Sequence, residues 1–246
     1  LQDIPGVLLL SDGDTCANEI AADPNALIFM FGDRFVSKTL LTSLSRGRPT
    51  FVQITPYLDR QDPNHMVTLR VESEIASAVS ELLNLNSSQE GDNAFLDLEE
   101  KGNDIEIEEI LESEQAFSTW VCSAIGPNTS LYLGNSMPIR YIDRNAKRTV
   151  PFGGSSCNVY ANRGASGIDG VLSSALGVAH ATNKHILLLI GDLSLLHDIG
   201  ALQLARGLRV TIVLVNNDGG IIFRKLPVAR QKHLFREFFQ APHGIH

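Results

Sequence analysis

A carboxylate and two carboxamides follow two apolar runs of the chain, at a spacing that would bring them together. Gly191 and Asp192 come directly after the aliphatic run at 186–190, and Asn216 and Asn217 come directly after the apolar run at 210–215. Both runs predict buried parallel strands, and apolar residues at helical spacing between them predict a connecting helix. Because the carboxyl ends of adjacent parallel strands meet at one edge of a sheet, these side chains are expected to lie side by side.

Such a set of oxygen ligands is suited to a hard divalent cation such as Mg²⁺, which also binds phosphate oxygens. Gly219 and Gly220 would let the main chain approach a diphosphate closely, and the hydroxyl of Ser194 could donate a hydrogen bond to it. An ordinary Rossmann-like unit with acidic and amide residues in its loops is the alternative. The order Gly-Asp, then the 23 residues 193–215, then Asn-Asn resembles the diphosphate-binding motif of thiamine diphosphate (ThDP) enzymes, although that family usually has a slightly longer spacing.

Composition excludes several classes of protein. The net charge of −8 argues against nucleic acid or an anionic membrane as a general partner. The three cysteines are far apart and odd in number, so neither a disulfide framework nor a cysteine metal site is predicted. No apolar run approaches the length of a membrane span, and no signal-like segment opens the chain. Because the chain begins without methionine, we expect it to be a piece of a longer protein.

The pattern predicts two α/β domains, each with a parallel sheet. Residues 1–86 carry strand candidates at 7–10, 26–31 and 51–54 that alternate with helical faces, which predicts a small central domain. Residues 87–110 are expected to form a solvated acidic linker rather than an acidic docking tail. The stretch from Glu90 to Glu114 contains eleven acidic residues and a single lysine. Residues 111–246 are then the second domain.

Two further strand-to-helix junctions are predicted in the second domain. The strand at 130–133 runs into Gly134–Arg140, and a second turn rich in small residues covers 162–170. Both junctions would lie at the sheet edge already assigned to Asp192. Arg140 and Arg163 at these junctions are either surface ion-pair formers or ligands for carboxylates, whose geometry a guanidinium group matches.

Taken together, these motifs resemble the family of 2-succinyl-5-enolpyruvyl-6-hydroxy-3-cyclohexene-1-carboxylate (SEPHCHC) synthases, which are ThDP enzymes of menaquinone and phylloquinone biosynthesis. The motifs are at 134–140, 162–170, 191–194 and 216–223. The resemblance implies that the second domain is a ThDP diphosphate-binding domain, cut short at its C-terminus. The first domain resembles the family's central domain more weakly, at Ser37-Lys38 and at 59–63.

The resemblance also implies roles for individual residues. Mg²⁺, or Mn²⁺ in its place, would be held by Asp192, Asn217 and the carbonyl of Gly219. ThDP would contact these residues together with Ile168, Gly191, Leu193, Ser194 and Gly220, and the apolar side chain of Ile168 would hold the cofactor in a bent conformation. The substrates would contact Ser136, Arg140, Arg163, Ile222, Phe223 and Leu226, with Lys38 as a weaker candidate.

The implied activity is that of a transferase which decarboxylates 2-oxoglutarate and adds the resulting succinyl carbanion equivalent to isochorismate. The glutamate that activates the cofactor is expected on a separate domain, so the isolated chain is expected to be inactive. The full-length protein would be a homodimer or homotetramer, without nucleic-acid or membrane partners, in bacterial cytoplasm or plastid stroma. Another ThDP carboligase or decarboxylase of the acetolactate-synthase type and a non-catalytic ThDP-binding remnant are the alternatives.

Overall fold

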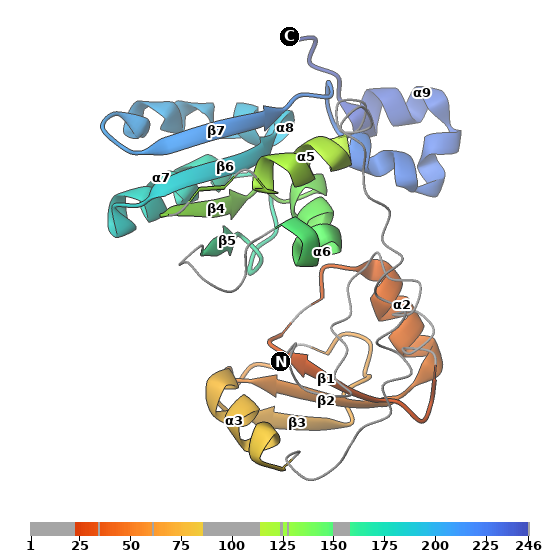
Figure 1. Cartoon of the computed structure of the whole chain (residues 1–246). Helices are drawn as coiled ribbons and strands as arrows, with labels where there is room; N and C mark the ends of the chain where they lie inside the picture. Colours follow the sequence, from red (N-terminus) through yellow and green to blue (C-terminus); the bar gives the residue numbers. More distant parts are fainter. Residues whose placement is uncertain are drawn as a thin grey trace. The chain divides into compact units, whose positions relative to one another are not determined.

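The chain carries two separate parallel sheets in two compact α/β units (Figure 1). One unit lies within residues 1–104 and the other within residues 105–246. The computed structural model describes residues 23–33, 35–60, 62–85, 114–123, 125–126, 128–149 and 158–245. Two parallel-sheet α/β regions were predicted, and this fold class is confirmed. The strand predicted at 7–10 and the linker predicted at 87–110 lie outside the described residues.

The first unit is a three-stranded parallel sheet in the order β1-β2-β3. Its elements are β1 (Leu27–Phe31), α2 (Lys38–Gly47), β2 (Thr50–Thr55), β3 (Leu69–Glu72) and α3 (Ile75–Leu85). Ser37 caps α2, because its hydroxyl oxygen accepts a hydrogen bond from the backbone N–H of Leu40 at 3.1 Å. The sequence did not predict β3, which is only four residues long and has no fully buried position.

Asp62 organises the loop between β2 and β3, in the stretch that resembles the central domain of the synthases. Its carboxylate accepts hydrogen bonds from the backbone N–H groups of Met66 at 2.8 Å and Val67 at 3.1 Å. Burial raises the pKa of Asp62, but these donors and Arg60 outweigh it and hold the pKa below its ordinary value. The ionised carboxylate therefore stabilises the loop at pH values above the ordinary aspartate pKa. This stabilisation is lost as the pH falls through the lowered pKa of Asp62.

The second unit is a four-stranded parallel sheet in the order β5-β4-β6-β7. Its regular elements are α5 (Glu114–Ser123), β4 (Thr129–Leu133), α6 (Met137–Thr149), β5 (Val159–Ala161), α7 (Val171–Thr182), β6 (His185–Gly191), α8 (Asp192–His197) and β7 (Val210–Val215). Short helical turns complete the unit, namely η2 (Ile199–Ala205), η3 (Ile221–Lys225), η4 (Pro227–Arg230), α9 (Lys232–Leu234) and the π-helical η5 (Phe235–Gln240). Within the described ranges, no helix has the length and apolar character needed to cross a membrane.

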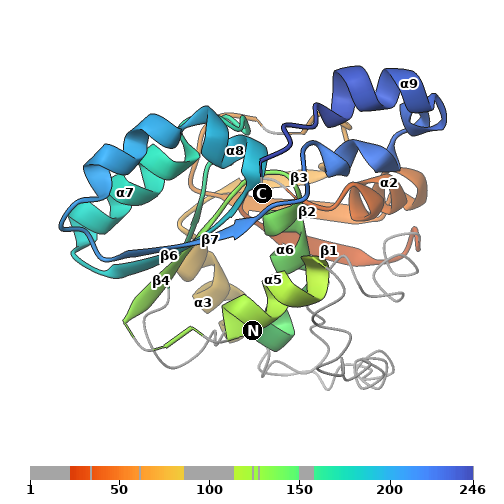
Figure 2. The ribbon, with the colours of Figure 1, turned by 90° about the horizontal axis from the view of Figure 1, so that it is seen from above.

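The core of the second unit lies between β6 and α7. Alternate residues of β6, Ile186, Leu188 and Ile190, are fully buried and pack with Leu172 and Leu176 of α7. The intervening residues of β6 point to the opposite face, because side chains alternate along a strand. Figure 2 shows α7 on one side of this sheet and α5 and α6 on the other. Both faces of β6 are therefore covered, which explains its uninterrupted aliphatic sequence.

The connection from β6 to β7 differs from the predicted helix. Leu202 and Leu204, two of the apolar residues whose spacing predicted the connecting helix, are 43% and 65% exposed and belong to the 3₁₀ turn η2. The α-helical part is α8, which begins at Asp192 itself and ends before Asp198. The carboxylate of Asp198 accepts from the backbone N–H of Ser173 at 2.7 Å and from its hydroxyl at 2.9 Å, so this residue is held by α7 and the helix does not continue through it.

Replacing a buried leucine and an exposed leucine of the second unit tests this packing. Leu188→Ala should lower the free energy of unfolding of the second unit by about 2–5 kcal/mol, because it leaves a cavity at a fully buried position of the core. Leu204→Ala is the matched control, and its effect should stay within about 0.5 kcal/mol. Urea unfolding followed by the fluorescence of Trp120, the single tryptophan of the chain, reports on this unit. Equal losses in the two variants would contradict the described core.

Candidate functional site

A cavity of about 350 Å³ opens where the strands of the second sheet end. Thirteen of the predicted site residues line it: Ser136, Arg140, Arg163, Ile168, Gly191, Asp192, Leu193, Ser194, Asn217, Gly219, Gly220, Ile222 and Phe223. Two predicted residues are not among those that line it. Leu226 lies just beyond η3 and is 42% exposed, and Lys38 begins α2 in the first unit. The structure therefore gathers the predicted residues of the four motifs in one cavity.

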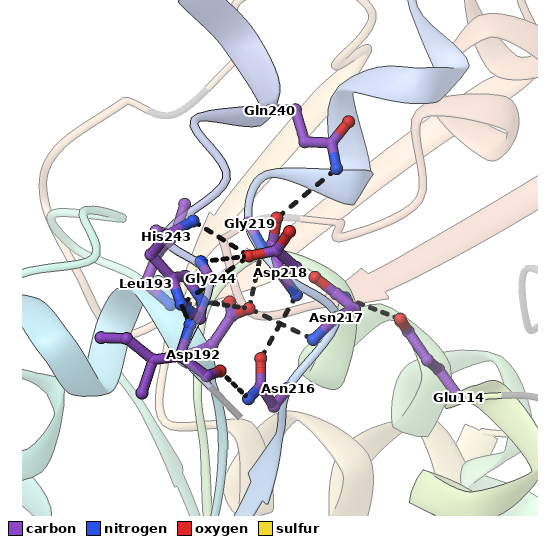
Figure 3. Close-up of polar contacts among 11 residues, drawn as sticks. Glu114, Asp192, Leu193, Asn216, Asn217, Asp218, Gly219, Gln240, His243 and Gly244 are labelled. Carbon is purple, nitrogen blue, oxygen red and sulfur yellow. Dashed lines mark hydrogen bonds and ion pairs between the residues drawn. The ribbon is translucent and has the colours of Figure 1, made fainter. Parts of the chain in front are cut away.

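The buried carboxylate of Asp192 joins three parts of the second unit (Figure 3). The pairing of Gly191 with Val215 brings Asp192 and Asn217 to adjacent strand ends, as predicted. Oδ2 of Asp192 accepts from the backbone N–H groups of Asn217 at 3.2 Å and Gly219 at 2.8 Å, and it contacts Nε2 of His243 at 3.0 Å. Oδ1 accepts from the N–H of Leu193 at 2.7 Å. The donors thus gather on Oδ2, and Oδ1 keeps room for a further ligand.

Asn217 presents an oxygen atom without a partner. Its Nδ2 group donates to Oε1 of Glu114 at 2.6 Å, whereas its buried Oδ1 has no hydrogen-bond partner among the described residues. A buried acceptor left unpaired is costly unless a ligand completes it. Together with Oδ1 of Asp192 and the carbonyl of Gly219, it forms a set of oxygen atoms that fits a hard divalent cation. Within the described ranges, no three His, Cys, Asp or Glu side chains gather as an alternative metal cluster.

The turn Asp218-Gly219-Gly220 is packed tightly against the end of η5. Gly219 has a φ of +121°, a region that favours glycine, and a Cβ atom there would overlap the carbonyl oxygen of Gln240. The N–H of Gly220 donates to that same carbonyl at 2.6 Å. Phe223 and Phe239 pack edge to face beside it, with ring centroids 5.9 Å apart. The glycine pair was predicted for close approach of a diphosphate, and the structure shows close approach of the chain's own backbone.

The segment after η5 reaches back to the site through His243. Its Nδ1 accepts from the backbone N–H of Ile245 at 3.0 Å, so its proton lies on Nε2 and is donated to Asp192. Asp218 fixes the same segment, because its Oδ1 accepts from the N–H groups of His243 at 3.0 Å and Gly244 at 2.7 Å. The carboxylate of Asp192 is therefore held in one orientation by residues up to 51 positions away in sequence.

The loop after β5 is tied to the loop after β4 by Asn135. The Nδ2 group of Asn135 donates to the carbonyl of Gly167 at 2.7 Å, and its Oδ1 accepts from Nη1 of Arg163 at 3.1 Å. The hydroxyl of Ser194 donates to the carbonyl of Ile168 at 2.9 Å, which connects the same loop to α8. These bonds hold Arg163 and Ile168 at the cavity wall. The proton of Ser194 is directed at protein, so its predicted donation to a diphosphate would require a different rotamer.

Tyr132 supports the same loop from β4. Its hydroxyl donates to Oδ1 of Asn162, and Nδ2 of Asn162 donates to the hydroxyl oxygen of Ser174 at 3.4 Å. Burial raises the pKa of Tyr132, although the hydrogen bond with Ser174 partly opposes this, so the phenol stays protonated and remains a donor around neutral pH. The side chain of Asn162, which precedes Arg163 in this loop, is thereby held at both of its polar atoms.

Arg140 is oriented by the turn that begins α6. Its Nη1 donates to the carbonyl of Ser136, one helical turn earlier. Ser136 itself has a φ of +74°, which is uncommon for a residue with a side chain and marks a constrained turn between β4 and α6. The partners named for Arg140 and Arg163 are a carbonyl and an amide oxygen, and both are neutral. Both contacts orient a guanidinium group, and the contact with Ser136 does so without cancelling the charge of Arg140.

Sequence reasoning missed three residues of the site. Glu114 was counted in the acidic run, Asn135 lies within the junction at 134–140 but was given no role, and no role was predicted for His243. The spacing of Glu114 and Ser118, four residues apart on one face of α5, was the available signal for the first, and both line the cavity. No local sequence pattern predicts the contact between His243 and Asp192, because that contact depends on η5 folding back onto the turn at Gly219 and Gly220.

The chain is similar in sequence to bacterial proteins named 2-succinyl-5-enolpyruvyl-6-hydroxy-3-cyclohexene-1-carboxylate synthase. It is 38% identical over 229 residues to the protein from Prosthecochloris aestuarii, covering 88% of this chain and 38% of that protein. It is 33% identical over 259 residues to the protein from Chlorobium luteolum, covering 99% of this chain and 44% of that protein. With the protein from Myxococcus xanthus, identity is 46% over 137 residues, or 54% of this chain and 23% of the relative.

Structural similarity agrees with this relationship at the level of the fold. A Mycobacterium smegmatis protein described as a thiamin diphosphate-dependent enzyme matches with a TM-score of 0.53 at 16% identity, covering 78% of this chain and 38% of that one. No protein-family model matches the chain. The chain spans about two fifths of the length of the first two relatives named above, since it covers 38% and 44% of them.

The close packing at Gly219 gives a direct test of the site's geometry. Gly219→Ala should lower the stability of the second unit by at least about 1–3 kcal/mol, because it combines an unfavourable φ with a clash against Gln240. Gly177→Ala is the matched control, since nothing lies within 4 Å of its Cβ position in α7, and it should be neutral or stabilising by up to about 1 kcal/mol. Thermal unfolding followed by Trp120 fluorescence measures both. A Gly219→Ala protein as stable as the wild type would contradict this turn.

Proposed function

Because the chain belongs by sequence to the family of SEPHCHC synthases, we propose that it provides the part of such an enzyme that binds the metal and the diphosphate of ThDP. The full-length protein would decarboxylate 2-oxoglutarate and add the resulting succinyl unit to isochorismate, as a step of menaquinone or phylloquinone biosynthesis. A transferase acting on two small anionic molecules has no use for nucleic acid or membrane. We place it in bacterial cytoplasm or plastid stroma, as a homodimer or homotetramer.

One observation carries this proposal. Oδ1 of Asp192 and the unpartnered Oδ1 of Asn217 lie at adjacent strand ends, in a cavity that the turn containing Gly219 also lines. Oxygen atoms of a carboxylate, an amide and a carbonyl are the ligands that Mg²⁺ prefers, and Mn²⁺ accepts the same set. The cation would be held by these three groups and by oxygen atoms of the diphosphate. A Rossmann-like unit without a ligand would not need to leave the Asn217 oxygen buried and unpaired.

The proposed substrates explain the two arginines of the cavity. Both substrates are dicarboxylates, and a guanidinium group matches a carboxylate with two parallel hydrogen bonds. Arg140 donates to the neutral carbonyl oxygen of Ser136, so its charge is available to a ligand in the cavity, and Arg163 lines the same cavity. Their support by Ser136 and Asn135 would reduce the entropy lost when a substrate binds. The pair therefore favours anionic substrates in a chain that is acidic overall.

The apolar part of the cavity suits the reacting carbon atoms. ThDP, when bound, supplies an electron sink for the carbon that loses CO₂. Ile168, Ile222 and Phe223 line the cavity, and Ile168 is 41% exposed although its side chain is apolar. An apolar side chain left open at the end of a sheet is suited to contact a ligand. We assign these three residues to excluding water from the reaction and Ile168 to holding the cofactor bent.

The metal part of the proposal predicts the behaviour of one isosteric variant. Asp192→Asn in the full-length protein should abolish the Mg²⁺-dependent binding of ThDP, because it removes the charge and turns one of the two oxygen atoms into a donor. Calorimetric titration of ThDP, with and without Mg²⁺, measures the effect. Glu237→Ala is the control, since it removes a half-exposed carboxylate outside the cavity. If Asp192→Asn bound ThDP with wild-type affinity, the proposed metal site would be wrong.

The arginine assignment predicts a different pattern. Arg140→Ala or Arg163→Ala should each lose about 2–5 kcal/mol of transition-state binding, as expected when a buried charge loses its partner. ThDP affinity should barely change. Measuring kcat/KM for both substrates in the full-length protein tests this, with the exposed Arg230 replaced by alanine as the control. An arginine variant with unchanged kcat/KM for both substrates would return that residue to a surface role and favour another ThDP enzyme.

A further inference from the structure

We propose that Glu114 is a positioning residue, whose carboxylate fixes the amide of Asn217 so that the amide oxygen is presented to the divalent cation. This inference rests on the proposed function and adds a residue to it. Glu114 is the first residue of α5, it lines the cavity, and it lies 103 positions before Asn217 in the sequence. It does not have to touch the cation in this role.

The hydrogen bond with the carboxylate of Glu114 decides the orientation of the side-chain amide of Asn217. A carboxylate oxygen accepts hydrogen bonds, so the atom of Asn217 that lies 2.6 Å from Oε1 of Glu114 must be the nitrogen. Turning the amide over would place two acceptors at this short distance. With nitrogen committed to Glu114, Oδ1 faces the other way, where it is buried and has no partner among the described residues. Glu114 thus makes the amide a donor on one side and a ligand on the other.

Glu114 is itself held in place. Its second oxygen, Oε2, accepts from the hydroxyl of Tyr141 on α6 at 3.3 Å, so both carboxylate oxygens have a donor. The backbone of Asn217 is fixed independently, because its N–H donates to Asp192. Asn217 is therefore restrained at its main chain by one carboxylate and at its side chain by another (Figure 3). Partners of this kind, one step behind a metal ligand, commonly set its orientation and affinity.

Two other roles for Glu114 would give different results on mutation. A carboxylate in the cavity could attract the cation through its charge, or it could bind the cation directly in place of Asn217. Both of these roles need the negative charge. The positioning role needs only an acceptor facing Nδ2 of Asn217. Glutamine keeps an acceptor oxygen and can turn its own amide nitrogen toward Tyr141, whereas methionine fills the same space without an acceptor.

The test is to measure the affinity of the full-length protein for Mn²⁺ in the presence of ThDP, by the electron paramagnetic resonance signal of free Mn²⁺. Glu114→Met should weaken Mn²⁺ binding by about 10- to 100-fold. Glu114→Gln should stay within about threefold of the wild type, because the hydrogen bond to Asn217 is kept. Glu237→Ala should bind as the wild type does. Thermal unfolding of each variant without metal separates a loss of ligand orientation from a loss of fold.

A double-mutant cycle with Asn217 makes the result decisive. If Glu114 acts through Asn217, adding Glu114→Met to Asn217→Ala should change Mn²⁺ affinity by less than about twofold. Full additivity, or a Glu114→Gln variant as weak as Glu114→Met, would overturn the positioning role. Wild-type affinity in Glu114→Met, with Asp192→Asn inactive in binding, would overturn this inference alone. Absence of Mn²⁺ binding in the wild type itself would instead overturn the proposed function.

Discussion

The buried carboxylate of Asp192 is the interaction on which the second unit depends. It is 5% exposed, and a charge removed from water must be compensated by hydrogen bonds or by a cation. Three backbone N–H groups and the ring of His243 supply that compensation. Two of the N–H groups come from the loop after β7, and the histidine comes from the end of the described chain. The positions of the glycine turn and of the final segment are therefore tied to this one group.

The parallel strands, and the sheet edge at which their carboxyl ends meet, could be predicted because both depend on simple local patterns in the sequence. The aliphatic run that became β6 is covered on both faces, whereas β7, which was also predicted to be buried, is an edge strand of the described sheet with partly exposed side chains. A right-handed crossover places Asp192 beside Asn217 without further information. The placement of Arg140 and Arg163 at this edge followed from the same rule, whereas Ser136 and Ile168 were expected at the site only from the resemblance to a family. Most of the candidate site was therefore accessible from the sequence, and the resemblance to a family assigned roles that the geometry accommodates.

The parts that could not be predicted depend on contacts between distant residues. Glu114 looks like one more member of an acidic run, and only the packing of α5 against α6 turns it toward Asn217. The contact of His243 with Asp192 depends on η5 folding back over the glycine turn. Leu202 and Leu204 of η2 have helical spacing but are exposed, and α8 ends before Asp198, whose carboxylate is bound by Ser173. In each case the local pattern was compatible with several structures, and hydrogen bonds between remote residues favoured one of them.

The distribution of charge in the cavity constrains how the proposed substrates would bind. The chain has a net charge of −8, so a dicarboxylate approaching from solution meets an unfavourable average potential, which salt screens beyond about 8 Å at physiological ionic strength. Attraction must then come from groups inside the cavity. Asp192 and Glu114 supply negative charge where the cation would lie, and Arg140 and Arg163 are the cationic residues proposed to bind the substrates. Because the guanidinium group of Arg140 is held by the neutral carbonyl oxygen of Ser136, a bound carboxylate need not displace an ion pair there. Selectivity for dianions would therefore arise from direct contact in the cavity, and only weakly from long-range steering.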